Sequence, residues 1–126
     1  MSDVRYTEDH AWISLDDDGV ATVGISDYAQ EQLGDIVYVQ LPDIGRDVVQ
    51  GEDAVMIESV KTTGEVKSPI GGRVIEVNDL LAEGPEQVNE SPLEDGWLYK
   101  LEPADETEVE NLMDGDDYED FVASLS

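Results

Sequence analysis

One lysine stands where the sequence predicts the tip of a tight hairpin. An apolar strand runs to Val60 and another resumes near Glu65, so Lys61 to Gly64 form the predicted turn. A lysine at such a tip projects its amine into solvent on a rigid support. A modifying enzyme could reach that amine, and an attached group could reach several partners. Most lysines at turn tips are merely solvated, so this feature alone leaves both interpretations open.

Other kinds of chemistry have few residues to use. The chain contains no cysteine, which excludes disulfides, thiolate metal sites and cysteine catalysis. His10 is the one histidine, too few for a histidine-based metal site or proton relay. The acids of Asp16–Gly19 do not have the spacing of a calcium loop and are typical of a solvated turn. We therefore predict no catalytic residues and no metal site.

The charge of the chain narrows the range of partners. Asp and Glu number 32 against 6 Lys and Arg, a formal net charge of −26. Nucleic acid and anionic membrane surfaces are excluded, because both would be repelled. Such charge destabilises a compact state unless salt screens it, and at ~1 M salt the screening length falls to ~3 Å. We expect a halophilic source; an ordinary acidic protein is the alternative.

The elements that must position Lys61 read as a β-rich body. The turn at Asp16–Gly19 separates two strands, and a capping box at Asp27–Gln30 opens a short helix that Gly34 ends. The expected strands are Trp12–Leu15, Val20–Ile25, Ile36–Leu41, Ala54–Ser59, one from Val66, Gly72–Val77 and Trp97–Leu101.

The apolar period changes after about residue 103. Val109, Leu112 and Met113 recur at helical spacing, as do Tyr118, Phe121, Val122 and Leu125. Asp105 with Glu108, and Asp116 with Glu119, form capping-box pairs. We predict one domain over 1–126, with a β body to about 103 and two helices in 104–125. We expect a cytoplasmic protein, because no apolar run suits a membrane span and no signal peptide is evident at residues 1–4.

A series of motifs runs in order through essentially the whole chain. The motifs are Tyr6–Ile13, Val23–Gln30, Leu33–Val37, Leu41–Gly45, Glu58-Ser59-Val60-Lys61, Ser68-Pro69-Ile70, Val74–Asn78 and Gly96-Trp97. This series closely resembles the H-protein family of the glycine cleavage system. The Glu-Ser-Val-Lys element is specific, since biotin acceptor domains usually carry Met-Lys-Met and the lipoyl domains of 2-oxo acid dehydrogenases usually carry Asp-Lys.

The resemblance implies a carrier, not an enzyme. It implies a lipoyl-type hybrid barrel-sandwich of mainly β structure, with a short helix after the first strands and two C-terminal helices. Lipoate would be in amide linkage to Lys61, and the hairpin residues would be Glu58, Ser59, Val60, Thr62, Thr63 and Gly64.

The implied role is shuttling the aminomethyl group of glycine. The implied partners are the glycine decarboxylase (P protein), the aminomethyltransferase (T protein), dihydrolipoyl dehydrogenase (L protein) and a lipoate-attaching enzyme. The alternative is an H-like protein that donates or relays lipoate to other complexes.

The chain departs from the family pattern at one informative position. The family usually has Glu between its His and Trp, where this chain has Ala11. In the family that Glu helps to hold the ammonium of the loaded arm in a surface cleft. We hypothesise that Asp9 and Glu65 replace it, because charge-assisted hydrogen bonds suit a methylamine cation.

Overall fold

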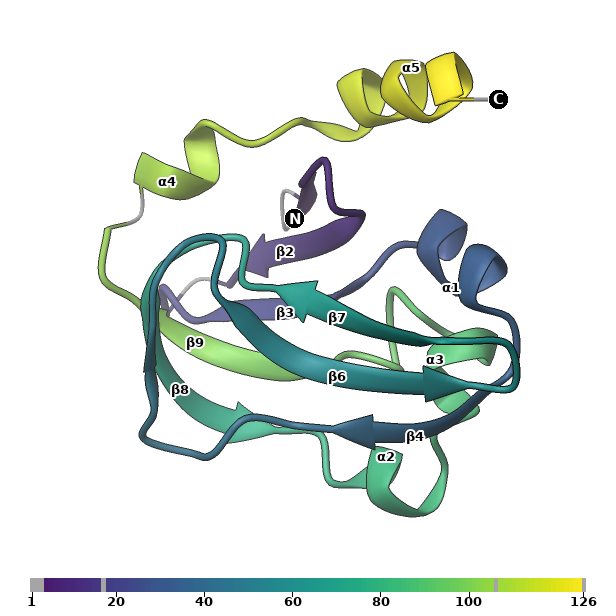
Figure 1. The fold of residues 1–126 in the computed structure, drawn as a ribbon. Helices are drawn as coiled ribbons and strands as arrows, with labels where there is room; N and C mark the ends of the chain where they lie inside the picture. Colours follow the sequence, from purple (N-terminus) through teal and green to yellow (C-terminus); the bar gives the residue numbers. More distant parts are fainter. Residues whose placement is uncertain (1–3, 17, 106, 126) are drawn as a thin grey trace.

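The structure, a computed structural model, describes residues 4–16, 18–105 and 107–125. The predictions made for residues 1–3 and for Asp17 therefore lie outside the described residues. Two antiparallel β-sheets form layers, and short helices lie around them (Figure 1). The strands are β1 Val4–Tyr6, β2 Ala11–Leu15, β3 Ala21–Ile25, β4 Ile36–Gln40, β5 Asp47–Val48, β6 Asp53–Ser59, β7 Thr63–Lys67, β8 Gly72–Val77 and β9 Tyr99–Pro103. The helices are α1 Asp27–Leu33, α2 Leu80–Glu83, α3 Gln87–Glu90, α4 Thr107–Glu110 and α5 Gly115–Leu125.

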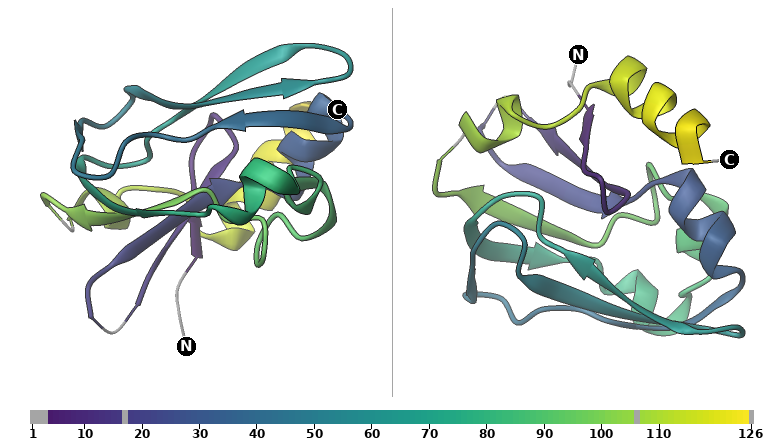
Figure 2. Two further views of the ribbon diagram at one scale, coloured as in Figure 1. Left: turned by 90° about the horizontal axis from the view of Figure 1, so that it is seen from below. Right: turned by 45° about the horizontal axis from the view of Figure 1, so that its top comes forward.

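The larger sheet has the order β1-β2-β3-β9-β8-β5, and the smaller sheet has the order β4-β6-β7. β9 comes from late in the chain yet lies between β3 and β8, with Val23 paired to Tyr99 and Gly72 to Pro103. The β2–β3 hairpin projects from one end of the body (Figure 2). The mainly β architecture with helices at the C-terminus agrees with the sequence prediction.

The core lies between the sheets, where alternate side chains of each strand point inward. Ile13, Val23, Ile57 and Val74 are fully buried, and each such side chain contributes roughly 1.5–3 kcal/mol. Tyr99 is also fully buried, and its hydroxyl donates to Ser68 Oγ at 3.0 Å. Burial raises the pKa of Tyr99 to about 12, against the lowering effect of that hydrogen bond.

The helix starts differ from the sequence prediction by one or two residues. Ser26, not Asp27, caps α1, and its Oγ accepts from the backbone N–H of Ala29 at 3.2 Å. Asp114, not Asp116, caps α5 by accepting from the N–H of Asp117. Ser26 lies one residue before the predicted cap and Asp114 two residues before it, and each has a side-chain oxygen as good an acceptor as the predicted one.

The predicted capping box at Asp105 forms only in part. The Asp105 carboxylate accepts from the N–H and hydroxyl of Thr107. Glu108 instead accepts from the N–H of Gly71 at 2.9 Å, which fastens α4 to the loop before β8. Met113 lies beyond α4 and forms a two-way backbone bridge with Tyr6.

Several strand limits and short elements also differ. β7 begins at Thr63 instead of near Glu65, and β9 begins at Tyr99 instead of Trp97. The sequence analysis did not predict β1, β5, α2 or α3, each of which is four residues or shorter. Within the described ranges, no helix combines the length and apolar character needed to cross a bilayer.

Candidate functional site

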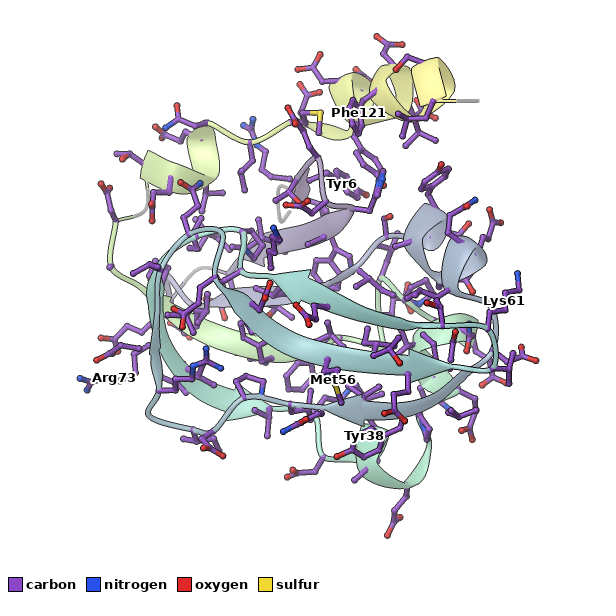
Figure 3. The ribbon with its side chains drawn as sticks, viewed as in Figure 1. Tyr6, Tyr38, Met56, Lys61, Arg73 and Phe121 are labelled. Carbon is purple, nitrogen blue, oxygen red and sulfur yellow. The ribbon has the colours of Figure 1, made fainter. Side chains whose placement is uncertain are left out.

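Lys61 lies at the tip of the β6–β7 hairpin, at one end of the molecule (Figure 3). The tip is tighter than predicted: it consists of Val60, Lys61 and Thr62, because Thr63 and Gly64 already pair with Glu58 and Ile57 in the sheet. Figure 3 shows the Lys61 side chain directed away from the two sheets, at the opposite end from Arg73.

Ser59 closes this turn with its side chain. Its Oγ accepts from the N–H groups of Lys61 and Thr62, at 3.2 and 3.1 Å, and donates to the carbonyl of Thr62 at 3.0 Å. Its backbone N–H also donates to that carbonyl, at 2.8 Å. The backbone that carries Lys61 is therefore fixed although the side chain is exposed.

A second support comes from the loop between α1 and β4. The N–H of Val60 donates to the carbonyl of Asp35 at 3.0 Å. The methylene stem of Lys61 lies over Gly34: a methyl group placed on Gly34 would be 3.1 Å from Lys61 Cε. Gly34 has φ 80 and ψ −157, a conformation that suits glycine. The outer part of the stem, at Cδ and Cε, thus lies against Gly34.

Asn89 on α3 holds this loop in place. Its Oδ1 accepts from the N–H of Ile36 at 2.9 Å. Its Nδ2 donates to the carbonyl of Gly34 at 2.8 Å and to Gln30 Oε1 at 3.0 Å. One of these partners, Gly34, is the residue against which the Lys61 stem lies, yet the sequence analysis did not single out Asn89.

The amine of Lys61 differs from most other cations of the chain. The described residues form two ion pairs, Arg46 with Glu52 at 2.8 Å and Arg73 with Asp47 at 3.3 Å. Lys100 lies over the Trp97 ring, 5.1 Å from its centroid. Lys67 is in β7, with its backbone opposite that of Asp53, and forms neither of these two ion pairs. In the described part of the chain, Lys61 Nζ has neither a hydrogen bond nor an ion pair, despite the 32 acids.

A cavity of about 190 Å³ lies beside the hairpin, between α1, β6, the middle of β7, the end of β3 and the loop before β2. Its apolar lining comes from Ile25, Ala29, Leu33, Ile57 and Val66. Its polar lining comes from Asp9, His10, Gln32 and Glu65. Asp9 and Glu65 therefore both border this cavity, while Ala11 is fully buried in β2. Glu65 also borders a second hollow of about 310 Å³ together with Asp53, and its carboxyl bonds to Asp53 on that side.

Two of these polar residues, Glu65 and His10, have pKa values shifted from their ordinary values. A hydrogen bond with the Asp53 carboxyl, and the charge of Asp53, raise the pKa of Glu65. Burial lowers the pKa of His10, and the neighbouring charge of Asp9 opposes that effect. The sequence analysis missed His10 as a cavity residue, since an isolated histidine carries no pattern that would place it there.

Among the residues that the structure describes, no group of three or more His, Asp or Glu side chains is arranged to hold a metal. The site consists of one supported, unpaired amine and an adjoining cavity with an apolar floor and an acidic rim. Such a site can hold a covalently attached arm and cover its far end.

Comparison with known proteins gives a consistent result. The profile of the family described as "Glycine cleavage H-protein" matches residues 4–125. The glycine cleavage system H protein of Rhodospirillum rubrum is 52% identical over 125 residues, covering 99% of both chains. That of Thermotoga maritima is 50% identical, covering 94% of this chain and 95% of its own length.

A solved structure supports the fold as well. The crystal structure of a glycine cleavage system H protein from Mycobacterium marinum superposes with a TM-score of 0.85 at 34% identity, covering 98% of this chain and 96% of that one. The expected lipoyl-type barrel-sandwich is thereby confirmed. The chain belongs to the glycine cleavage H-protein family.

Proposed function

We propose that this chain is the lipoyl carrier of a glycine cleavage system and that lipoate is attached by an amide bond to Lys61 Nζ. The supporting observation is the state of that amine: it stands on a hairpin fixed by Ser59 and Gly34, and no acid of the described chain pairs with it. Amide formation needs a primary amine that an enzyme can reach, and Lys61 offers one.

The residues present fit such an attached group. When bound, lipoate supplies the sulfur chemistry that receives the aminomethyl group of glycine. The share of the protein is to position this arm and to cover its loaded end. The cavity beside the hairpin suits that task, because its apolar floor excludes water and its rim carries acids.

Asp9 and Glu65 are proposed to hold the cationic end of the loaded arm in this cavity. The carboxyl of Glu65 bonds to Asp53 beside the neighbouring hollow, so this role requires its side chain to turn toward the arm cavity. An ammonium group offers these carboxylates a stronger, charge-assisted partner. The two acids thus stand in for the carboxylate that Ala11 does not supply.

This role requires the partners expected from the sequence. They are glycine decarboxylase, the aminomethyltransferase, dihydrolipoyl dehydrogenase and a lipoate-attaching enzyme. The chain itself acts as a carrier, and the chemistry belongs to those enzymes and to the lipoyl group.

Peptide mapping after expression with a lipoate-attaching enzyme tests the attachment site. We expect lipoate on Lys61 alone. Lys61→Arg should abolish the modification with little effect on folding, because a guanidinium stays protonated and is not acylated. Lys67→Arg and Lys100→Arg are the matched controls and should be modified like the parent. Lipoate found on Lys67 or Lys100 would overturn the assignment.

Transfer of the aminomethyl group to the lipoylated chain distinguishes the carrier role from a role as a relay of lipoate. Incubation of the lipoylated chain with glycine and glycine decarboxylase should add the aminomethyl group, measured as intact mass. A chain that carries lipoate but never accepts this group would instead favour the relay role.

Spontaneous ammonia release from the loaded chain, without aminomethyltransferase, tests the rim acids. Glu65→Gln and Asp9→Asn should each hasten it, whereas Glu76→Gln on the exposed face of β8 should not. Equal rates in all three variants would contradict the role of Asp9 and Glu65.

A further inference from the structure

Three hydrogen-bonded side chains join the C-terminal helix α5 to two walls of the cavity. The hydroxyl of Tyr118 on α5 lies 2.8 Å from His10 Nδ1 and 2.7 Å from Ser26 Oγ. His10 lines the cavity directly. Ser26 is the N-cap of α1, the helix whose Ala29 and Leu33 form part of the apolar floor.

Aromatic packing makes this junction rigid. Tyr118 is buried and stacks on Tyr6, with ring centroids 4.3 Å apart and an interplanar angle of 7°. The His10 ring lies 4.7 Å from Tyr28 and 5.9 Å from Phe121. Figure 3 labels Tyr6 and Phe121 in this layer beneath α5, and Figure 2 shows α5 beside α1. Residues from both ends of the chain and from α1 thus enclose the imidazole.

The backbone of His10 is also unusual. Its φ is 68, in the left-handed region that residues other than glycine seldom occupy. Its N–H donates to the carbonyl of Thr7 at 3.0 Å, and its carbonyl accepts from the N–H of Ser26 at 2.9 Å. Such conformations persist only where the surroundings determine them, and they gather at functional sites.

We propose that Tyr118 is a positioning residue for the cavity: it fixes the imidazole of His10 and the start of α1, so that α5 supports the wall on which the loaded arm rests. This inference rests on the proposed function, because it takes the cavity as the resting place of the arm.

The hydrogen bonds fit a neutral imidazole. Nδ1 of His10 then accepts from the Tyr118 hydroxyl, which in turn accepts from Ser26. A neutral ring is compatible with a cationic cargo in the cavity, whereas an imidazolium would repel it. The titratable groups around His10 are Asp9 from its own loop, Glu65 from β7 across the cavity, Tyr6 from β1, Tyr28 from α1 and Tyr118 from α5.

The single histidine of the chain makes the test direct, since its ring gives one imidazole titration by NMR. In the unmodified protein, Tyr118→Phe should raise the pKa of His10, because the neutral form loses its donor. Tyr99→Phe is the matched control: it also removes a buried bond between a tyrosine and a serine hydroxyl, but away from the cavity. It should leave the titration of His10 as in the parent.

The loaded protein gives the second readout. In the parent, loading with glycine and glycine decarboxylase should lower the pKa of His10, because a cation arrives beside it. In Tyr118→Phe this response should shrink, and ammonia release without aminomethyltransferase should become about 3- to 10-fold faster, the usual effect of one hydrogen bond. Tyr99→Phe should behave like the parent in both.

The outcomes separate this inference from the proposed function. A parent that takes no lipoate on Lys61 overturns the proposed function, and this inference with it. A parent that loads normally but whose His10 does not respond overturns the inference alone. A Tyr118→Phe variant that behaves like the parent also overturns the inference alone. The same holds if Tyr99→Phe shows every effect that Tyr118→Phe shows.

Discussion

At the scale of single residues, Gly34 lies directly against the stem of Lys61. Its backbone conformation is nearly restricted to glycine, and such a conformation costs other residues about 1–3 kcal/mol. Gly34→Ala should therefore lower the free energy of unfolding by about that much, measured by urea denaturation. It should also slow lipoylation, because the new methyl group would meet the Lys61 stem at 3.1 Å.

Gly45→Ala is the control for this prediction. Gly45 also has a positive φ, of 94, but nothing lies within 4 Å of a methyl group added there. The control should lose stability without any change in the rate of lipoylation. Equal rates of lipoylation in the two variants would show that the contact with Gly34 does not position the lysine.

Tyr99 makes the stability of the fold sensitive to alkaline pH. Its pKa is about 12 when folded, against 10.0 for an ordinary tyrosine. The unfolded chain therefore releases the phenolic proton first, and the stabilisation that is fully present below pH 10 is lost as pH rises to 12. The slope approaches about 1.4 kcal/mol per pH unit. Urea denaturation between pH 9 and 12 should show this fall in the parent and a shallower one in Tyr99→Phe.

At the scale of elements, Asn89 joins α1, α3 and β4 behind the hairpin. Asn89→Ala removes three hydrogen bonds and leaves the carbonyl of Gly34 and the N–H of Ile36 without these partners. We expect a loss of about 2–3 kcal/mol in the free energy of unfolding. Hydrogen exchange should rise at Val60, whose N–H donates to the adjoining Asp35. Unchanged hydrogen exchange at Val60 would mean that the hairpin keeps its structure without the hydrogen bonds of Asn89.

The elements that the sequence predicted are those with local signals. The two strands around Asp16–Gly19 carry apolar residues and turn chemistry in one short stretch, and β2 and β3 form there. β5 has only two residues and depends on pairing with Gly72 and Arg73, far along the chain. α2 and α3 are single turns whose N-cap residues, Asp79 and Glu86, make no side-chain capping bond, so neither has a capping signature.

The features of the candidate site also fall into those predicted from local sequence and those that depend on distant contacts. The position of Lys61 at a hairpin tip follows from the local sequence pattern. The predicted turn extends to Gly64, whereas Thr63 and Gly64 belong to β7. The support from Gly34 and Asn89 and the link from His10 to Tyr118 join residues far apart in the sequence, 108 positions in the latter case. Side-chain contacts at such separations leave no periodic trace in a single sequence. Only the resemblance to a family suggested Asp9 and Glu65 in advance.

At the scale of the whole molecule, a net charge of −26 makes folding dependent on salt. Few of these acids are paired, since the described residues form two ion pairs. The melting temperature should rise from low to molar potassium chloride, because screening relieves repulsion between carboxylates. Differential scanning calorimetry checks this prediction. A melting temperature that is flat or falls would contradict the halophile expectation and leave the carrier role unaffected.

The central place of β9 in the larger sheet affects the order in which the two sheets can be completed during synthesis. During synthesis the hairpin that carries Lys61 emerges before β9, whereas the larger sheet has a gap between β3 and β8 until β9 emerges. β9 is the last strand of the described chain, so this gap closes later than the smaller sheet can form. Pairing of such distant segments is also slow. The Lys61 hairpin, in the smaller sheet, and its Gly34 support both belong to the part of the chain before β9. An enzyme that recognises only this hairpin therefore does not have to wait until the larger sheet is complete.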